Sequence, residues 1–140
     1  MNETDDVLYL VHIWRTARLI EQTLAVGPES IEADPNFRDA TFYRLHTLAE
    51  STQKLSSEIK DRNPDIPWRE IAGMRNRLVH GYHEIQMSLV LNALAELHSL
   101  TECVQRELGA LVLSNEIDKE VLLEIEQLRQ PGLGDKSLEL

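Results

Sequence analysis

Apolar residues in this chain recur at intervals of three and four, and no segment alternates apolar and polar residues with a period of two. The first spacing gathers side chains on one face of an α-helix, whereas a half-buried strand requires the second. The sequence therefore predicts an all-α fold, a bundle of four main helices plus a short C-terminal helix. The four main helices are expected over residues 5–26, 37–62, 67–80 and 84–110, with a connection at 28–36.

The C-terminal part differs from the rest in composition. Residues 115–129 predict a short acidic helix, and the sequence QPGLGDKSLEL after it predicts a loose tail. We therefore divide the chain into a helical domain at residues 1–114 and an acidic helix with its tail at residues 115–140.

The net charge of −10 is concentrated at the two ends. Residues 1–6 hold three acids and no base, and residues 115–140 hold seven acids against three bases, so residues 7–114 carry only −3. Within residues 68–83 the balance is positive, with three arginines against one glutamate. This distribution leaves room for a local basic site, but it disfavours broad binding to duplex DNA.

Three features indicate a cytoplasmic protein that does not bind a membrane. The single cysteine, Cys103, cannot form an internal disulfide, which favours a reducing compartment. The acidic start, MNETDD, lacks the basic residues of a secretory signal. No apolar run approaches the roughly 18 residues of a membrane span.

The helix expected at 67–80 carries a cation on its apolar side. Placed on a wheel of about 100° per residue, its apolar stripe is predicted to consist of Ile71, Ala72, Leu78 and Val79. Arg75 falls within that stripe, whereas Arg77 falls on the opposite side. Because an unpaired buried cation is costly, Arg75 must reach a groove, a partner or an anion.

A second set of polar residues lies along the same helix and extends to its last residue. Asn76 and His80 are four residues apart and share a face, so the amide could orient the imidazole. Arg69 and Gly73 extend this line, and Gly73 leaves a gap that another backbone or a substrate could approach. Arg75 and His80 lie about 140° apart on an ideal helix. They converge only if the helix loosens at Gly81 or if a partner completes the site.

An arginine that binds phosphate and a histidine that moves a proton suffice for metal-free attack of an RNA 2′-hydroxyl on the adjacent phosphate. From spacing alone a structural interpretation stays open, in which His80 caps the helix end and Arg75 pairs with a neighbouring acid. A metal site is not expected, because His80 and His83 have no third ligand nearby. No cofactor is expected either, since the chain has no glycine-rich phosphate loop.

The sequence PDIPWREIAGMRNRLVHGY, residues 64–82, resembles the signature of the HepT-like branch of the HEPN superfamily. The resemblance rests on Arg75, Asn76, His80 and Tyr82, together with the flanking segment 67–71. It extends over about residues 5–110 and leaves residues 111–140 unexplained. It implies a HEPN-like helical bundle that forms a homodimer, with a composite ribonuclease cleft between two copies of the motif.

The resemblance also implies a role for each motif residue. Arg75 would bind phosphate, Asn76 would support the site and His80 would transfer a proton. Apart from the resemblance, Arg69 and Arg77 are weaker candidates for substrate binding, and Arg77 can also be an ordinary solvated residue. The protein would be the toxin of a type VII-like toxin–antitoxin system, a metal-independent endoribonuclease that acts on RNA. Its antitoxin would be an MntA-like minimal nucleotidyltransferase, which adds AMP to Tyr82. The alternative is a non-catalytic helical interaction module that binds a nucleotidyltransferase partner or RNA.

Overall fold

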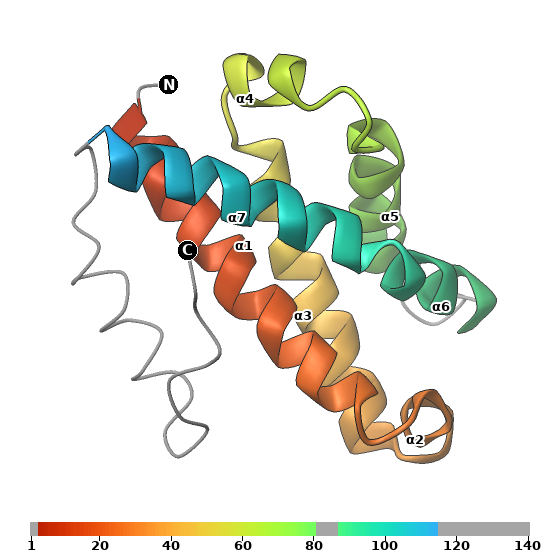
Figure 1. The fold of residues 1–140 in the computed structure, drawn as a ribbon. Helices are drawn as coiled ribbons and strands as arrows, with labels where there is room; N and C mark the ends of the chain where they lie inside the picture. The colour runs from red at the N-terminus through yellow and green to blue at the C-terminus, as the bar shows by residue number, and fades with distance from the viewer. Residues whose placement is uncertain (1–2, 81–86, 115–140) are drawn as a thin grey trace.

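The computed structural model of this chain describes residues 3–80 and 87–114, and all regular structure within them is helical (Figure 1). The helices are α1 (Glu3–Leu24), α2 (Pro28–Ala33), α3 (Pro35–Gln53), α4 (Ser57–Arg62), α5 (Trp68–His80), α6 (Met87–Ala95) and α7 (Leu97–Leu113). The prediction of an all-α fold is confirmed. The short acidic helix and the tail expected at 115–140 lie outside the described residues.

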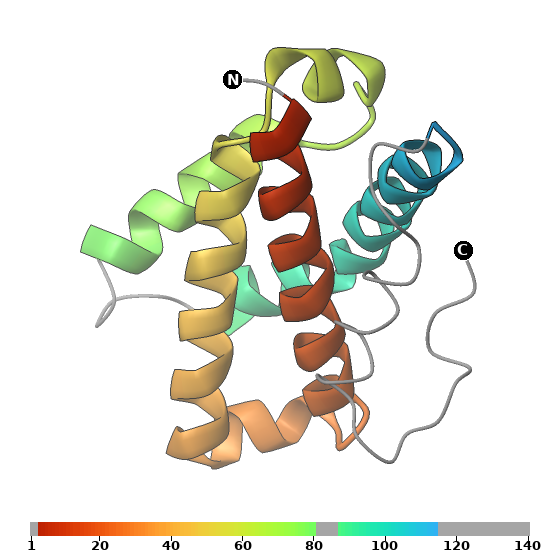
Figure 2. The same ribbon diagram turned by 90° about the vertical axis from the view of Figure 1, so that its left-hand side faces the viewer.

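The long helices pack side by side around one apolar core. Figure 2 shows α3 between α5 and α1, with α7 on the other side of α1. The core takes residues from all of these helices, among them Leu10, Ile13, Trp14, Leu45, Leu48, Met74, Leu100 and Val104. Since α5 stands at one edge of this row, only one of its faces is covered by α3. Every helix in the described part of the chain is too short or too polar to cross a membrane.

The prediction of one continuous helix over residues 37–62 is wrong, because the structure divides this segment into α3 and α4. Ser56 ends the continuity by capping α4, where its Oγ accepts a hydrogen bond from the Ile59 amide at 3.4 Å. The Ser56 amide in turn donates to Asp6 Oδ1 at 2.8 Å, which ties this break to the start of α1. A serine placed to cap thus overrides an apolar period that continues through the break.

The connection predicted at 28–36 contains the short helix α2. Gly27 ends the turn after α1 with φ of 122°, a conformation that glycine adopts without strain. Asp34 then caps α3 by accepting the Asn36 amide at 2.9 Å, and Pro35 occupies the first turn.

The helix predicted over 84–110 is also divided, into α6 and α7. The break falls at Glu96, whose amide bonds the Ala93 carbonyl oxygen at 3.2 Å in a tighter turn. No proline or glycine marks this position in the sequence. The division lets α6 take a direction of its own while α7 crosses α1 (Figure 1).

Candidate functional site

The site helix α5 is held at its start by Asn63, a buried residue that caps the end of α4. The Asn63 carbonyl oxygen accepts a hydrogen bond from Trp68 Nε1 at 3.0 Å, and its amide nitrogen Nδ2 donates to Glu107 Oε2 at 2.9 Å. Arg62 Nη2 donates to the other oxygen of Glu107 at 2.7 Å. We call these four residues the Asn63 network. It fixes the first turn of α5 against α7.

The charge state of Glu107 depends on this network. Burial raises the pKa of the Glu107 carboxyl, but the hydrogen bonds from Arg62 and Asn63 outweigh it, and the pKa lies below its ordinary value. The same hydrogen bond from Arg62 to Glu107 raises the pKa of the Arg62 guanidinium. Glu107 is therefore an ionised acceptor in the folded protein at neutral pH.

The inner face of α5 differs from the stripe that the sequence predicts. Met74 and Leu78 are buried and Ile71 is half-buried, so these three residues carry the contact with α3. Val79 was expected in the stripe, but 42% of its surface is exposed. The centre of the contact lies on the Met74 side of the helix, which turns Val79 outward and leaves Ala72 half-buried.

Arg75 lies at the edge of that inner face. Its side chain is half-buried, and Nε is buried with no hydrogen-bond partner among the described residues. Nη1 donates to Asn76 Oδ1 at 3.3 Å. Within the described residues no carboxylate pairs with Arg75, so the predicted alternative of an ion pair with a neighbouring helix finds no partner there. The guanidinium is thus oriented by Asn76 and keeps a free donor.

Arg69 and Arg77 lie on the outer face of α5, where both are exposed. Together with Glu70, Gly73 and Met74 they line an open hollow of about 350 Å³, which we call the arginine groove. The structure therefore brings Arg69 and Arg77 to one surface, and Arg75 and Asn76 to another part of the same helix.

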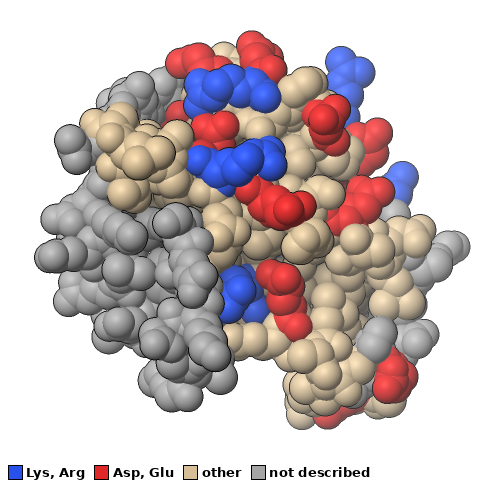
Figure 3. Space-filling model, viewed as in Figure 1, with Lys and Arg blue, Asp and Glu red and all other residues tan. Residues whose placement is uncertain are grey.

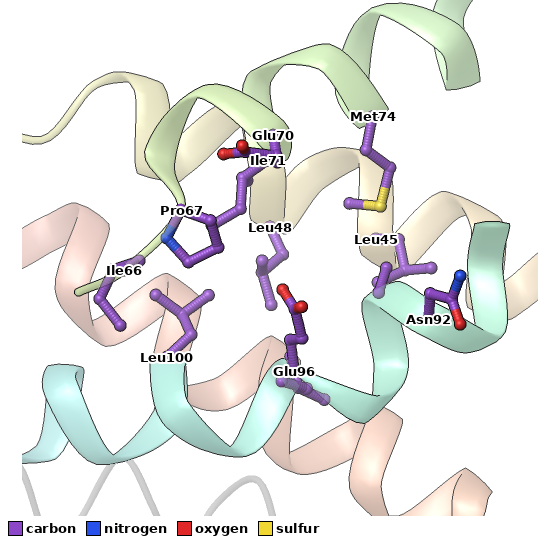
Figure 4. A pocket seen from close by; sticks show the side chains of 12 residues that line it. Leu45, Leu48, Ile66, Pro67, Glu70, Ile71, Met74, Asn92, Glu96 and Leu100 are labelled. Atoms are coloured by element: carbon purple, nitrogen blue, oxygen red, sulfur yellow. The ribbon is translucent and has the colours of Figure 1, made fainter.

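A second hollow, the apolar pocket, lies between α5 and the junction of α6 and α7 (Figure 4). Its volume is about 210 Å³, and it is lined by Leu45, Leu48, Ile66, Pro67, Glu70, Ile71, Met74, Asn92, Ala93, Glu96, Leu97 and Leu100. Glu96 reaches from the helix junction toward α5, which carries Glu70. The walls are apolar, and these two exposed carboxylates are the charged groups among the lining residues.

The remaining predicted residues lie at the end of α5 and beyond it. His80 is the last residue of the helix, but its side chain, like all of Tyr82 and His83, lies outside the described part of the chain. In Figure 2 the end of α5 points away from α1 and α7. Whether His80 meets Arg75 therefore stays a prediction. Within residues 3–80 and 87–114, no three histidine, cysteine or acidic side chains gather as a metal-binding group.

Charge on the molecular surface is mixed. On the face shown in Figure 3, basic and acidic side chains alternate across the described part of the molecule. Such a face offers no broad cationic surface of the kind that binds duplex DNA without sequence preference. A basic site on this face would therefore have to be local.

The sequence reasoning missed the Asn63 network, although α7 carries a signal for it. Glu107 stands three residues after Val104 and directly before Leu108, two buried positions of the same helix. An acid at such a position predicts a cation or an amide opposite, because a carboxylate is rarely buried without a partner. The partners come from a turn 44 residues earlier, and no local pattern identifies them.

Comparisons with known proteins agree on one family. The family described as ribonuclease HepT-like matches residues 13–107. A protein of Caldanaerobacter subterraneus subsp. tengcongensis named "Putative RNase TTE0752" is 31% identical over 105 residues, which cover 71% of this chain and 94% of the relative. "Probable ribonuclease HepT" of Thermococcus cleftensis is 29% identical over 89 residues, which cover 63% of this chain and 81% of the relative. No solved structure gives a significant match.

Proposed function

Because this chain belongs to the ribonuclease HepT-like family, we propose that it is a metal-independent endoribonuclease and the toxin of a type VII-like toxin–antitoxin pair. The observation that carries the proposal is Arg75. Its guanidinium is half-buried, oriented by Asn76, and keeps a buried donor without a partner among the described residues. A half-buried guanidinium that no described carboxylate neutralises is the kind of group that binds a phosphate through its accessible nitrogens.

The proposed reaction uses the hydroxyl that distinguishes RNA from DNA. His80 takes the proton of a 2′-hydroxyl, and the freed oxygen attacks the adjacent phosphorus, while Arg75 stabilises the charge that develops on the phosphate. The bond from phosphorus to the 5′-oxygen breaks, leaving a 2′,3′-cyclic phosphate and a 5′-hydroxyl. The departing 5′-oxygen takes a proton from a water molecule, and the protonated His80 returns its proton to the solvent.

The test compares Arg75→Ala and His80→Ala with wild type on a labelled single-stranded RNA. We expect each change to lower the cleavage rate by about a hundredfold or more, because each removes a group that acts on the transition state. Cleavage should persist in EDTA, and the matching DNA strand should stay intact.

Two variants serve as matched controls for this test. Arg38→Ala and His98→Ala remove the same residue types from α3 and α7, where each side chain has an ion pair with an acid on its own helix. Both controls should cleave as wild type does. If folded Arg75→Ala and His80→Ala proteins cleave as fast as these controls, the catalytic assignment is wrong.

The proposed off-switch is Tyr82. A nucleotidyltransferase antitoxin would attach AMP to its hydroxyl, and the added phosphate would place negative charge where the RNA phosphate binds. The chain is incubated with the partner and ATP and then weighed by mass spectrometry. An AMP-sized gain is expected in wild type and in Tyr43→Phe, a variant of a tyrosine that is 69% exposed on α3. An adduct that persists in Tyr82→Phe places the modification elsewhere.

The apolar pocket favours a second candidate function, a non-catalytic module that binds a nucleotidyltransferase partner. Glu70 and Glu96 flank apolar walls, and neither forms an ion pair within the described residues. This chemistry fits a partner segment that presents an apolar side chain next to a lysine or arginine. Filling the pocket with Ala93→Phe should weaken partner binding in calorimetry. Tight partner binding by wild type without RNA cleavage at any dose would favour this function over the first.

A further inference from the structure

Gly73 lies in the middle of α5, where neither the packing of the described residues nor the backbone conformation requires a glycine. Among the described residues, a Cβ atom built at Gly73 meets no atom within 4 Å, apart from the neighbours and backbone of its own helix. Its backbone is helical, so no positive φ requires glycine. Glycine inside a helix is less stable than alanine at the same position. The missing side chain therefore leaves open space on the surface of α5.

Two arginines flank this space. Arg69 precedes Gly73 by four residues and Arg77 follows it by four, so the three positions form one line along the outer face of α5. The ends of this line are roughly 12 Å apart along the helix axis, from a rise of 1.5 Å per residue. Neither arginine forms an ion pair within the described residues. The lining of the arginine groove holds one carboxylate, Glu70, against these two cations.

We propose that one strand of RNA crosses α5 at Gly73, with its phosphates bound by Arg69 and Arg77. This inference rests on the proposed ribonuclease function and assigns a substrate track to it. The absent side chain lets the sugar–phosphate backbone approach the helix closely, and the flanking cations offset its charge. Position 80 lies two helical turns beyond Gly73 on the same side of α5, so the track leads toward the proposed proton-transfer residue.

The arginine groove is suited to a single strand rather than to a duplex. It is formed by five residues of a single helix, two of them arginines and one a glutamate. A duplex needs a broad cationic surface, whereas one strand needs only a few well-placed cations. A second copy of the chain is the competing occupant, because a gap on a helix also admits another backbone.

The experiment uses the full chain and a fluorescent single-stranded RNA of mixed sequence with 2′-O-methyl groups, which block the attacking oxygen. Binding of this probe is measured by anisotropy, so it does not depend on cleavage. Gly73→Ala is compared with Gly109→Ala, its matched control in α7, where an added Cβ also meets no atom within 4 Å. Both variants should raise the melting temperature by about 3 °C. Only Gly73→Ala should weaken RNA binding, by about tenfold.

The roles of Arg69 and Arg77 are tested by measuring how the affinity for the RNA probe depends on salt concentration. Arg69→Gln and Arg77→Gln should each reduce the slope of log affinity against log salt by about 0.7, the value for one contact to a single strand. Arg38→Gln, at the opposite end of α3 from the α5 contact, should leave the slope unchanged.

Each outcome separates this inference from the function on which it rests. If wild type cleaves RNA but Gly73→Ala binds the probe as tightly as Gly109→Ala does, the track is wrong and the ribonuclease stands. If no variant cleaves and the Gly73→Ala defect in binding appears, the track stands without the nuclease. If Gly73→Ala changes the mass in light scattering and leaves RNA binding unchanged, the gap serves contact between two copies and the proposal is overturned.

Discussion

At the scale of single residues, the arrangement of Arg75 depends on its neighbour in the chain. Asn76 Oδ1 accepts from Arg75 Nη1 at 3.3 Å, which fixes the direction of a side chain that would otherwise sample many rotamers. The helical spacing predicts that Asn76 orients His80. The observed hydrogen bond gives Asn76 a partner on Arg75 instead, and its relation to His80 stays a prediction.

We expect Asn76→Ala to lower kcat/KM for RNA cleavage by roughly threefold to tenfold, the range for one hydrogen bond of about 1 kcal/mol. Stability should hardly change, because Asn76 is exposed. Steady-state kinetics and a melting curve on the same preparation measure both. Asn92→Ala, an exposed asparagine of α6, is the control. Equal rates for the two variants would show that Asn76 does not orient the guanidinium during catalysis.

The sequence could predict much of how α5 presents its residues, but not the direction of its contact. The exposure of Arg77 is as the helical period predicts, whereas Arg75, which was predicted within the stripe, lies at its edge. The burial of Met74 and the exposure of Val79 also differ from the prediction. A wheel shows which residues share a face, whereas the neighbouring helix decides which part of a wide apolar face is the centre of the contact. Here α3 contacts the Met74 side.

At the scale of elements, α5 is placed by residues outside it. The Asn63 network joins the end of α4 and the first turn of α5 to α7, through a carboxylate whose side chain is only 13% exposed. Its Arg62 partner is 59% exposed, so solvent screens part of their attraction. The network thus stabilises the fold through its hydrogen bonds more than through charge.

This arrangement predicts how stability changes with pH. The pKa of Glu107 is lowered in the folded protein, so its contribution is complete above the ordinary value of 4.5 and is lost as pH falls through the folded pKa. We expect Glu107→Gln to cost about 1 kcal/mol at pH 7, or about 3 °C in melting temperature. The difference from wild type should shrink as the pH falls below 4.5. Thermal melts across pH 3 to 7 measure it.

Glu102→Gln is the matched control for this prediction. Glu102 lies on the same helix and is exposed, and among the described residues its carboxylate pairs with His98 alone, one turn away at 3.6 Å. Exposed pairs of this kind contribute little, so its melting temperature should follow wild type at every pH. A Glu107→Gln deficit that stays constant down to pH 3 would mean that the carboxylate charge has no part in the network.

The sequence predicts the existence of the long helices better than it predicts their breaks. An apolar period continues through Ser56 and Glu96, so the pattern alone favours single helices there. At Ser56 the break depends on Asp6, which is 50 residues away in the chain. Such a contact exists only after α1 and α3 pack together. The break at Glu96 has no local signal, and we find no single side chain that causes it.

At the scale of the whole molecule, helix geometry predicts that a single chain leaves the proposed site incomplete. Arg75 lies beside the inner stripe of α5, whereas position 80 lies about 140° away on an ideal helix. The helix stands at the edge of the bundle, and its end points away from α1 and α7 (Figure 2). The end of α5 is therefore available to a second copy. This placement is compatible with the proposed homodimer, in which Arg75 of one chain works with His80 of the other.

A mixture of two inactive variants tests that arrangement directly. If each working pair spans both chains, a mixed dimer holds one intact pair. That pair consists of His80 of the Arg75→Ala chain and Arg75 of the His80→Ala chain. Random pairing makes half of the dimers mixed, each with one of two sites intact, so about a quarter of wild-type cleavage should return. If Arg75 and His80 act within one chain, every site lacks one of them and no activity returns.

The two variants are co-expressed with different tags and purified through both tags in turn. This selects the mixed dimer and should raise its activity to about half of wild type. The background is the cleavage activity of each variant alone, expressed as two differently tagged copies and purified in the same way. Recovery no greater than that background would place both residues of each working site in one subunit.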